Sequence, residues 1–270
     1  MNELASKRAT QWTIVNLIVF FATLGFNYLG ASGFFNDMGQ AAVSSKYQTL
    51  LTPNGFAFSI WGVIYTLVFA TLVYLFIKRK DPAVAKLIRM VSAPFVVSCL
   101  FNMAWIVAFS YEKMALSTFF IVGILVSLMT IVHRIYNARA EVPYTLAGTA
   151  FSLYGSWVFV ATILNTAILA VKQDWQSFGI SPSVWTIIVL LVIVAAIIAY
   201  VKRYQNVVFP IAVAWAFFGI YSSYTNGLVA PPLAVIIQIV LLLGMAVFIA
   251  LIGYTFYKNR YAIFPPTRAR

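Results

Sequence analysis

The sequence contains few charged residues, one cysteine and one histidine. Charged residues make up 9% of the 270 positions, against roughly 25% in soluble domains, and the mean hydropathy is +0.93. This composition excludes a secreted globule, a disordered tail and a nucleic-acid-binding domain, so no nucleic acid is expected as a partner. Because Cys99 is the only cysteine, neither an intramolecular disulfide nor a cysteine metal cluster can form.

Ionisable residues are also missing from the interior of the long apolar runs. Proton relays, voltage sensors and ion-coupled carriers keep a charged residue inside the membrane, and a retinal pigment needs a lysine there. Paired carboxylates and a Ser-His-Asp triad are lacking as well, so we predict no catalytic residues and no metal site. The only histidine, His133, lies beside Arg134 near the end of a run. It is interpreted as an interfacial residue, with a haem or metal ligand as the alternative.

What the sequence has is eight long apolar runs. A helix that crosses a bilayer needs about 20 mostly apolar residues, and charged residues and helix breakers divide the chain into runs of that length. We therefore predict an all-α polytopic membrane protein. Its eight transmembrane helices are expected near residues 12–31, 55–77, 90–110, 114–136, 144–171, 183–201, 206–222 and 231–257.

The positions of the 18 Lys and Arg residues predict the orientation of these helices. If the N-terminus is inside, all of them except Lys46, Lys113 and Lys172 fall on the inner side. Short cytoplasmic loops retain positive charge, so both termini are predicted to be inside. In the alternative, the sixth and seventh helices form a re-entrant pair, which would place Lys202 and Arg203 outside.

Aromatic and uncharged polar side chains occupy the interior of several predicted helices. Such residues can line a pocket for a flat hydrophobic ligand, because ligand sites are mostly apolar with a few polar groups that fix orientation. The alternative is structural, since Trp and Tyr gather at membrane interfaces and Asn bridges packed helices. The residues concerned are Trp61, Tyr65, Asn102, Trp105, Tyr154, Trp157 and Asn165.

Three segments, read in order, favour the pocket. Residues 47–65 read Tyr-Gln-Thr-Leu-Leu-Thr-Pro and then Phe-Ala-Phe-Ser-Ile-Trp with a Tyr four residues later. Residues 102–109 read Asn-Met-Ala-Trp with a Phe four residues later, and residues 154–165 read Tyr-Gly-Ser-Trp-Val-Phe-Val-Ala-Thr-Ile-Leu-Asn. Together they resemble the first loop and the second, third and fifth helices of the TspO/translocator-protein family, also called tryptophan-rich sensory proteins or peripheral benzodiazepine receptors.

The resemblance implies a five-helix bundle whose outward-opening pocket, capped by the first loop, binds porphyrins and other flat hydrophobic molecules. The implied lining residues are Ala57, Phe58 and Trp61 from the second helix, Asn102 and Trp105 from the third, and Trp157, Ala161 and Leu164 from the fifth. The spacing of the last three places them on one stripe of a helix. For each residue the alternative role is packing within the bundle.

The sequence departs from the family pattern at two places. Ser59 stands where a proline is expected two residues before Trp61, so the mouth of the pocket is expected to differ. No tyrosine lies between Leu164 and Lys172, so the sterol consensus pattern proposed for animal members is absent. That pattern is itself a weak indicator, but its absence lowers the expectation of cholesterol binding.

The resemblance covers about residues 10–172 and suggests a division of the chain. Residues 1–172 would form the ligand-binding bundle, and residues 173–270 a three-helix membrane extension. Shorter family members dimerise, and a homodimer is one expectation here; alternatively, the extra helices could supply the same surface in cis. The lipid bilayer is the expected surrounding, and the resemblance suggests a bacterial cytoplasmic membrane.

The leading functional hypothesis is a non-enzymatic integral membrane protein that binds a tetrapyrrole-like or other flat hydrophobic molecule, and transports or senses it. No cofactor is required, and a porphyrin would be a ligand. Two alternatives remain open at this point. One is an enzyme that degrades porphyrin with light and oxygen, and the other is a small-molecule permease unrelated to porphyrins.

Overall fold

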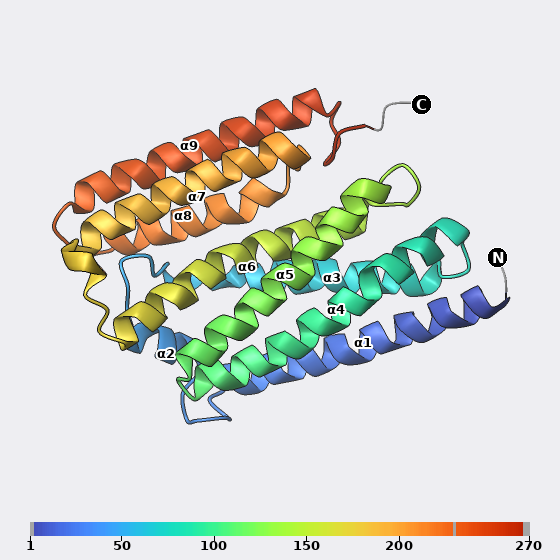
Figure 1. Ribbon diagram of the computed structural model, residues 1–270, viewed down its shortest axis with the longest axis horizontal. Helices are drawn as coiled ribbons and strands as arrows, with labels where there is room; N and C mark the ends of the chain where they lie inside the picture. Colours follow the sequence, from blue (N-terminus) through green and yellow to red (C-terminus); the bar gives the residue numbers. More distant parts are fainter. Residues whose placement is uncertain (1–2, 229–230, 267–270) are drawn as a thin grey trace.

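The computed structural model describes residues 3–228 and 231–266, and every regular element in these ranges is helical (Figure 1). The elements are α1 (Glu3–Ala31), α2 (Gln40–Lys46), the 3-10 helix η1 (Gly55–Ser59), α3 (Ile60–Ile77), α4 (Pro82–Ser110), α5 (Met114–Ala138), α6 (Thr145–Lys172), the 3-10 helix η2 (Ser177–Gly179), α7 (Pro182–Tyr204), α8 (Phe209–Thr225) and α9 (Ala234–Lys258).

Seven helical segments in the described ranges are long and apolar enough to cross a membrane, namely α1, η1 with α3, α4, α5, α6, α7 and α9. The 17 residues of α8 make it shorter than these seven. The chain is therefore a helical membrane protein, as predicted. Each of the eight predicted runs overlaps one of these seven segments or α8.

Four helix starts lie three or more positions from the predicted ones. α1 begins at Glu3 and not near residue 12, and α8 begins at Phe209 and not at residue 206. α4 begins at Pro82 and not at residue 90, because Asp81 caps it: the carboxylate accepts hydrogen bonds from the backbone N–H groups of Ala83 (2.8 Å) and Val84 (3.2 Å). A carboxylate cap followed by proline is a strong helix start, and it outweighs the charges of the first turns. α9 begins at Ala234, three positions after the predicted residue 231.

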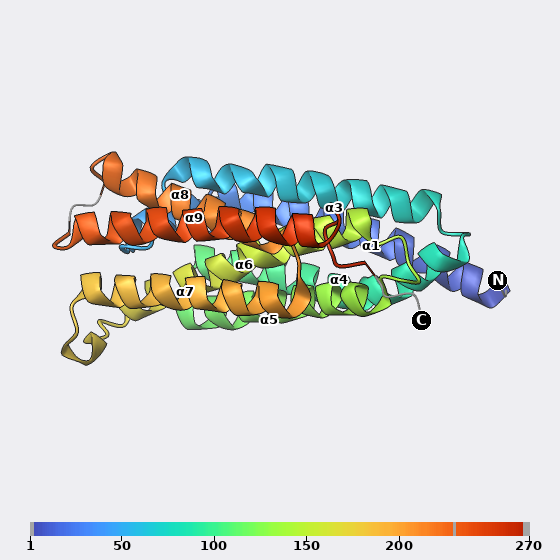
Figure 2. The same ribbon diagram turned by 90° about the horizontal axis from the view of Figure 1, so that it is seen from above.

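The long helices form two groups. α1, α3, α4, α5 and α6 pack as a five-helix bundle, in which α4 lies between α1 and α5, and α6 lies between α5 and α3. α7, α8 and α9 form the second group, and α8 joins it to the bundle by packing on α6 and η1. α1 begins and α9 ends at the same end of the molecule (Figures 1 and 2).

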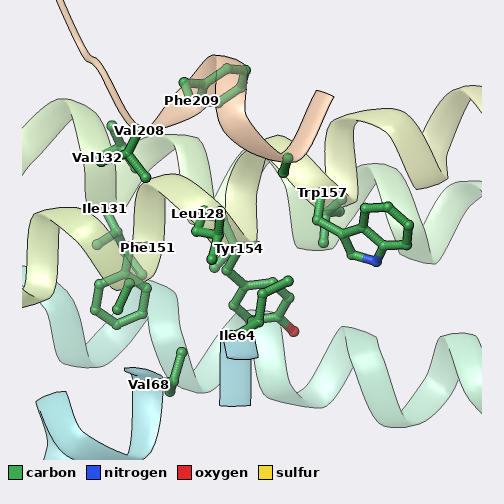
Figure 3. Close-up of a cluster of buried hydrophobic side chains, with 14 of the residues drawn as sticks. Ile64, Val68, Leu128, Ile131, Val132, Phe151, Tyr154, Trp157, Val208 and Phe209 are labelled. Carbon is green, nitrogen blue, oxygen red and sulfur yellow. The ribbon is translucent and has the colours of Figure 1, made fainter. Parts of the chain in front are cut away.

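The centre of α6 is buried on all sides, at every position from Ala150 to Val158. Figure 3 shows Phe151, Tyr154 and Trp157 along this stretch, with α3 side chains on one side and the start of α8 on the other. The absence of a side chain at Gly155 lets α5 and the start of α8 approach α6 closely. α6 is thus the element that both helix groups share.

A buried asparagine ties α8 to α6. Asn206 is fully buried, and its side-chain amide donates a hydrogen bond to the Ser152 hydroxyl at 2.8 Å. Its side-chain carbonyl accepts from the backbone N–H groups of Val208 (3.0 Å) and Phe209 (3.3 Å), which begin α8. One side chain therefore caps the start of α8 and fixes it to the central helix.

We expect Asn206→Ala to lower the free energy of unfolding by about 1–3 kcal/mol, because it leaves buried polar groups without partners. Equilibrium unfolding in mixed micelles, followed by circular dichroism, measures the change. Asn226→Ala is the matched control, because Asn226 is exposed at the end of α8. Equal stability of the two variants would contradict the role assigned to Asn206.

Candidate functional site

A cavity of about 450 Å³ lies among α1, α2, the first loop, α3, α4 and α6. It reaches the end of the bundle that carries α2 and Lys172. Its lining is uncharged, and a volume of this size falls within the range of ordinary ligand pockets. The lining residues are Asn27, Ala31, Gln40, Ser44, Ser45, Thr52, Pro53, Gly55, Phe58, Trp61, Tyr65, Trp105, Phe109, Trp157, Ala161, Leu164, Asn165 and Ile168.

Two stacked aromatic pairs form much of the apolar lining. The rings of Trp61 and Tyr65 on α3 stack with centroids 5.3 Å apart, and those of Trp105 and Phe109 on α4 stack at 5.5 Å. Both pairs have the i, i+4 spacing that brings side chains together on one helix face. The indole of Trp157 stands edge-on to that of Trp61, with centroids 6.3 Å apart. The cavity therefore offers large, rigid ring surfaces.

The α6 wall is a stripe of residues one and two turns apart. It runs from Trp157 through Ala161 and Leu164 to Ile168, which is the i, i+4, i+7, i+11 pattern of one helix face. The methyl group of Ala161 is the smallest of these side chains. The space of the cavity is therefore partly the result of a small residue between two large ones.

Two buried donors face the cavity without ordinary partners. The indole N–H of Trp157, a residue 1% exposed, has no hydrogen-bond acceptor among the described residues. The hydroxyl of Tyr65 lies near Asn27 and Asn102 but makes no hydrogen bond of ordinary geometry within the described ranges. A buried donor without an acceptor is costly. A ligand that carries an acceptor atom would satisfy either group.

Asn165 has a structural role as well as a place in the lining. Its side-chain carbonyl accepts a hydrogen bond from the indole N–H of Trp105 at 3.0 Å. Its amide donates to the hydroxyls of Ser117 (2.9 Å) and Thr118 (2.8 Å) on α5. Asn165 thus joins α6 to α4 and α5 and fixes the orientation of the Trp105 ring.

The structure brings together six of the eight residues that the resemblance placed in a pocket. The cavity is lined by Phe58, Trp61, Trp105, Trp157, Ala161 and Leu164. Ala57 and Asn102 do not line it. Ala57 is fully buried toward α8, where a Cβ atom at Gly219 would lie 2.7 Å from the Ala57 methyl. Asn102 is fully buried between helices: it accepts from the Asn27 amide at 2.8 Å and donates to the Tyr154 hydroxyl at 3.3 Å.

The polar part of the lining was not among the predicted site residues. Asn27 comes from α1, and Gln40, Ser44 and Ser45 come from α2. α2 is a short helix within a loop, and nothing in the hydropathy of residues 32–54 indicated that it folds over the pocket. The one available signal for Asn27 was its polar side chain within an otherwise apolar first helix.

α8 holds the part of the first loop that forms one wall of the cavity. The Tyr224 hydroxyl donates to the Leu50 carbonyl at 2.9 Å, and the Ser223 hydroxyl donates to the Thr52 carbonyl at 3.1 Å. The Asn54 N–H donates to the Gly219 carbonyl at 2.9 Å, and the Trp215 indole donates to the Ala57 carbonyl at 2.8 Å. The backbone groups of Leu50, Thr52 and Asn54 lie outside the helices and need partners of this kind, so the C-terminal group fixes the loop.

A polar latch fastens α2 over the cavity. The carboxylate of Glu112, in the turn after α4, accepts hydrogen bonds from Lys46 (2.6 Å) and from the Tyr47 hydroxyl (2.5 Å). Lys172, at the end of α6, lies 3.8 Å from the same carboxylate. The Lys46 hydrogen bond, followed by that of Tyr47, lowers the pKa of Glu112, and the bond to Glu112 raises the pKa values of Lys46 and Tyr47.

His133 is not among the residues that line the cavity, and its side chain has two partners of its own. Its Nδ1 atom is 3.3 Å from the Tyr204 hydroxyl, and its Nε2 atom is 2.9 Å from the Asn137 amide nitrogen. Within the described ranges, no three His, Cys, Asp or Glu side chains gather closely enough to hold a metal ion. The cavity therefore offers binding surface and hydrogen-bond donors.

Comparison with protein families matched residues 13–254 to the family described as TSPO-like protein. The matched range extends beyond residues 10–172, on which the sequence resemblance rested, and takes in α7, α8 and most of α9. Comparisons with curated proteins and with solved structures gave no match. The three C-terminal helices are therefore part of what this family shares with the chain.

We expect Glu112→Gln to weaken the latch and to speed amide hydrogen exchange in residues 40–47, measured by mass spectrometry. In the wild type, the protection of residues 40–47 from exchange should be lost on acidification, as the pH falls through the lowered pKa of Glu112. A carboxylate with a lowered pKa stabilises the folded state only at pH values above that pKa. Glu141→Gln, which removes the exposed carboxylate paired with Lys86 at the other end, is the control. Unchanged exchange in Glu112→Gln would contradict the latch.

We expect Tyr224→Phe to speed hydrogen exchange in residues 50–57 about fivefold, because one hydrogen bond to the loop, worth about 1 kcal/mol, is lost. Tyr221→Phe on the same helix is the matched control. If both variants exchange like the wild type, α8 does not hold the loop.

Proposed function

The chain belongs to the TSPO-like family, and on this premise we propose that it binds a flat hydrophobic molecule of the tetrapyrrole type in the cavity between α3, α4 and α6. The observation that carries the proposal is the indole N–H of Trp157, which is buried at the cavity without an acceptor among the described residues. A porphyrin offers flat apolar rings for the aromatic walls and polar atoms as acceptors.

Apolar contact supplies most of the expected affinity. Burial of apolar surface contributes about 25 cal/mol per Å², and the ring faces of Trp61 and Trp105 add the specific geometry of aromatic contacts. The lining carries no charged side chain, so the carboxylates of a porphyrin belong at the mouth. Lys46 and Lys172 lie there, beside Glu112 in the latch. A ligand carboxylate would replace Glu112 as the ion-pair partner of these lysines.

Eight membrane spans with both termini inside are part of the proposal. α8 is about 26 Å long at 1.5 Å per residue, close to the ~30 Å of a bilayer core, and it packs beside α9 (Figure 2). Lys46, Lys113 and Lys172 share the end that carries the cavity mouth, while the other 13 Lys and Arg residues that the structure describes belong to the opposite end or its flanking loops. The cavity then opens to the outside.

The division at residue 172 is likewise proposed, with residues 1–172 as the ligand-binding bundle and 173–270 as its extension. The extension contributes hydrogen bonds to the cavity wall, so the two parts would act as one unit. It also covers the α6 and η1 surfaces, which favours a monomer over a homodimer. The proposed location is a bacterial cytoplasmic membrane.

The test is a titration of the purified protein with protoporphyrin, followed by the porphyrin absorption band. We expect Trp157→Ala to weaken binding at least about tenfold, a loss of ~1.4 kcal/mol, and Trp157→Phe to weaken it by a smaller factor, because an aromatic ring is retained although the N–H and part of the ring area are lost. Trp12→Phe, on α1 and outside the lining, is the control.

Unchanged affinity in both Trp157 variants would contradict the site. Light-dependent loss of the porphyrin spectrum in the wild type would favour degradation over simple binding. An absence of saturable binding by the wild type would remove the tetrapyrrole from the proposal.

A further inference from the structure

A second and larger cavity, of about 1050 Å³, lies on the other side of α6, between α6 and α7. The first cavity uses the stripe from Trp157 to Ile168, whereas this one uses Phe159, Ile163 and Ala167. Its second wall is α7. The first loop and the linker after α6 close the end of the cavity that lies near Asp174. We call it the α6–α7 cleft.

The α6–α7 cleft opens sideways, toward lipid. Its walls are two helices with the length and composition of membrane spans, and several of its lining side chains are well exposed, for example Val192 at 61% and Val171 at 47%. The neighbouring medium at this depth is hydrocarbon. An occupant must therefore be a molecule that lies in the bilayer.

The depth of the cleft suits a lipid chain. The α7 wall runs from Pro182 to Ala196, about 21 Å at 1.5 Å per residue, which is more than half of a ~30 Å hydrocarbon core. The inner lining is apolar, with Val189 and Ile193 on α7 facing the α6 residues. A single acyl chain of the outer leaflet matches this length and character.

The mouth of the cleft is aromatic and acidic. The rings of Trp175 and Trp185 lie 5.4 Å apart, and the Trp185 indole donates to the Ser177 carbonyl at 2.9 Å, which fixes its orientation. Among the described residues that line the cleft, Asp174 is the one with a charged side chain. The nearest lysine along the chain is Lys172. Its ammonium group donates a hydrogen bond to the backbone carbonyl of Glu112, so it lies at the latch. Indole faces beside a carboxylate favour an ammonium group.

We propose that the α6–α7 cleft binds one phospholipid of the outer leaflet whose head group carries an ammonium, with an acyl chain between α6 and α7 and the ammonium at Trp175, Trp185 and Asp174. The tryptophans lie where such residues meet lipid head groups. The site is separate from the porphyrin cavity and does not depend on the function proposed above.

The test uses the full chain reconstituted in bilayers of equal parts phosphatidylethanolamine and phosphatidylglycerol, which carry the same acyl chains but differ in the ammonium. Native mass spectrometry after mild detergent extraction counts the retained lipids. We expect one retained phosphatidylethanolamine, favoured about fivefold over phosphatidylglycerol, a ratio that corresponds to ~1 kcal/mol. Equal retention of the two lipids, or retention of neither, would overturn the proposal.

Two kinds of variant test the binding of the acyl chain and the binding of the head group separately. Ala167→Trp and Ala196→Trp fill the cleft from its two walls and should abolish retention, whereas Ala246→Trp, at an exposed position of α9, should leave it intact. Asp174→Asn should reduce the preference for phosphatidylethanolamine to near unity without abolishing retention. Helix content and elution volume identify filled variants that are misfolded. Retention by both folded filled variants, or an unchanged preference in Asp174→Asn, would overturn the assignment.

Discussion

The burial of the centre of α6 on all sides, from Ala150 to Val158, is the constraint on which the rest of the structure depends. A membrane helix is usually free to face lipid along one side, but α6 contacts α5 and α3 in the bundle and α8 in the second group. Gly155 permits close packing with α5 and α8, and Asn206 holds the start of α8 against α6. The end of α6 toward Lys172 borders two separate cavities. Toward Lys172 the helix separates the aromatic cavity on one face from the α6–α7 cleft on the other.

The aromatic cavity depends on elements far apart in the sequence. Its wall includes a loop that cannot satisfy its own backbone groups, and in a membrane protein such groups need protein partners wherever water is excluded. α8 supplies them through Trp215, Gly219, Ser223 and Tyr224. The latch at Glu112 holds the same loop at Lys46 and Tyr47. The C-terminal helices are therefore coupled to the pocket, in agreement with a family match that continues through them to residue 254.

The candidate site could be predicted in part, and the limits have physical causes. The family resemblance implied Trp157, Ala161 and Leu164, and they lie together because helical spacing places them on one stripe. Ala57 lies in a 3-10 helix that turns it toward Gly219, and Asn102 turns toward Asn27 and Tyr154, so neither lines the cavity. Spacing within one helix gives no information on which neighbour a face will meet. The residues of α2 were missed because their contribution depends on how a loop folds over the bundle.

The sequence by itself determined that this is a helical membrane protein and where its apolar segments lie. These properties follow from the thickness of the bilayer and from local composition, which a single segment carries within itself. Only the tertiary structure decided which faces of the helices enclose the cavity, that α8 supports its loop, and that a second cleft separates α6 from α7. The helices are apolar on nearly every face, so lipid-facing and protein-facing sides have similar side chains, and packing between distant segments is what distinguishes them.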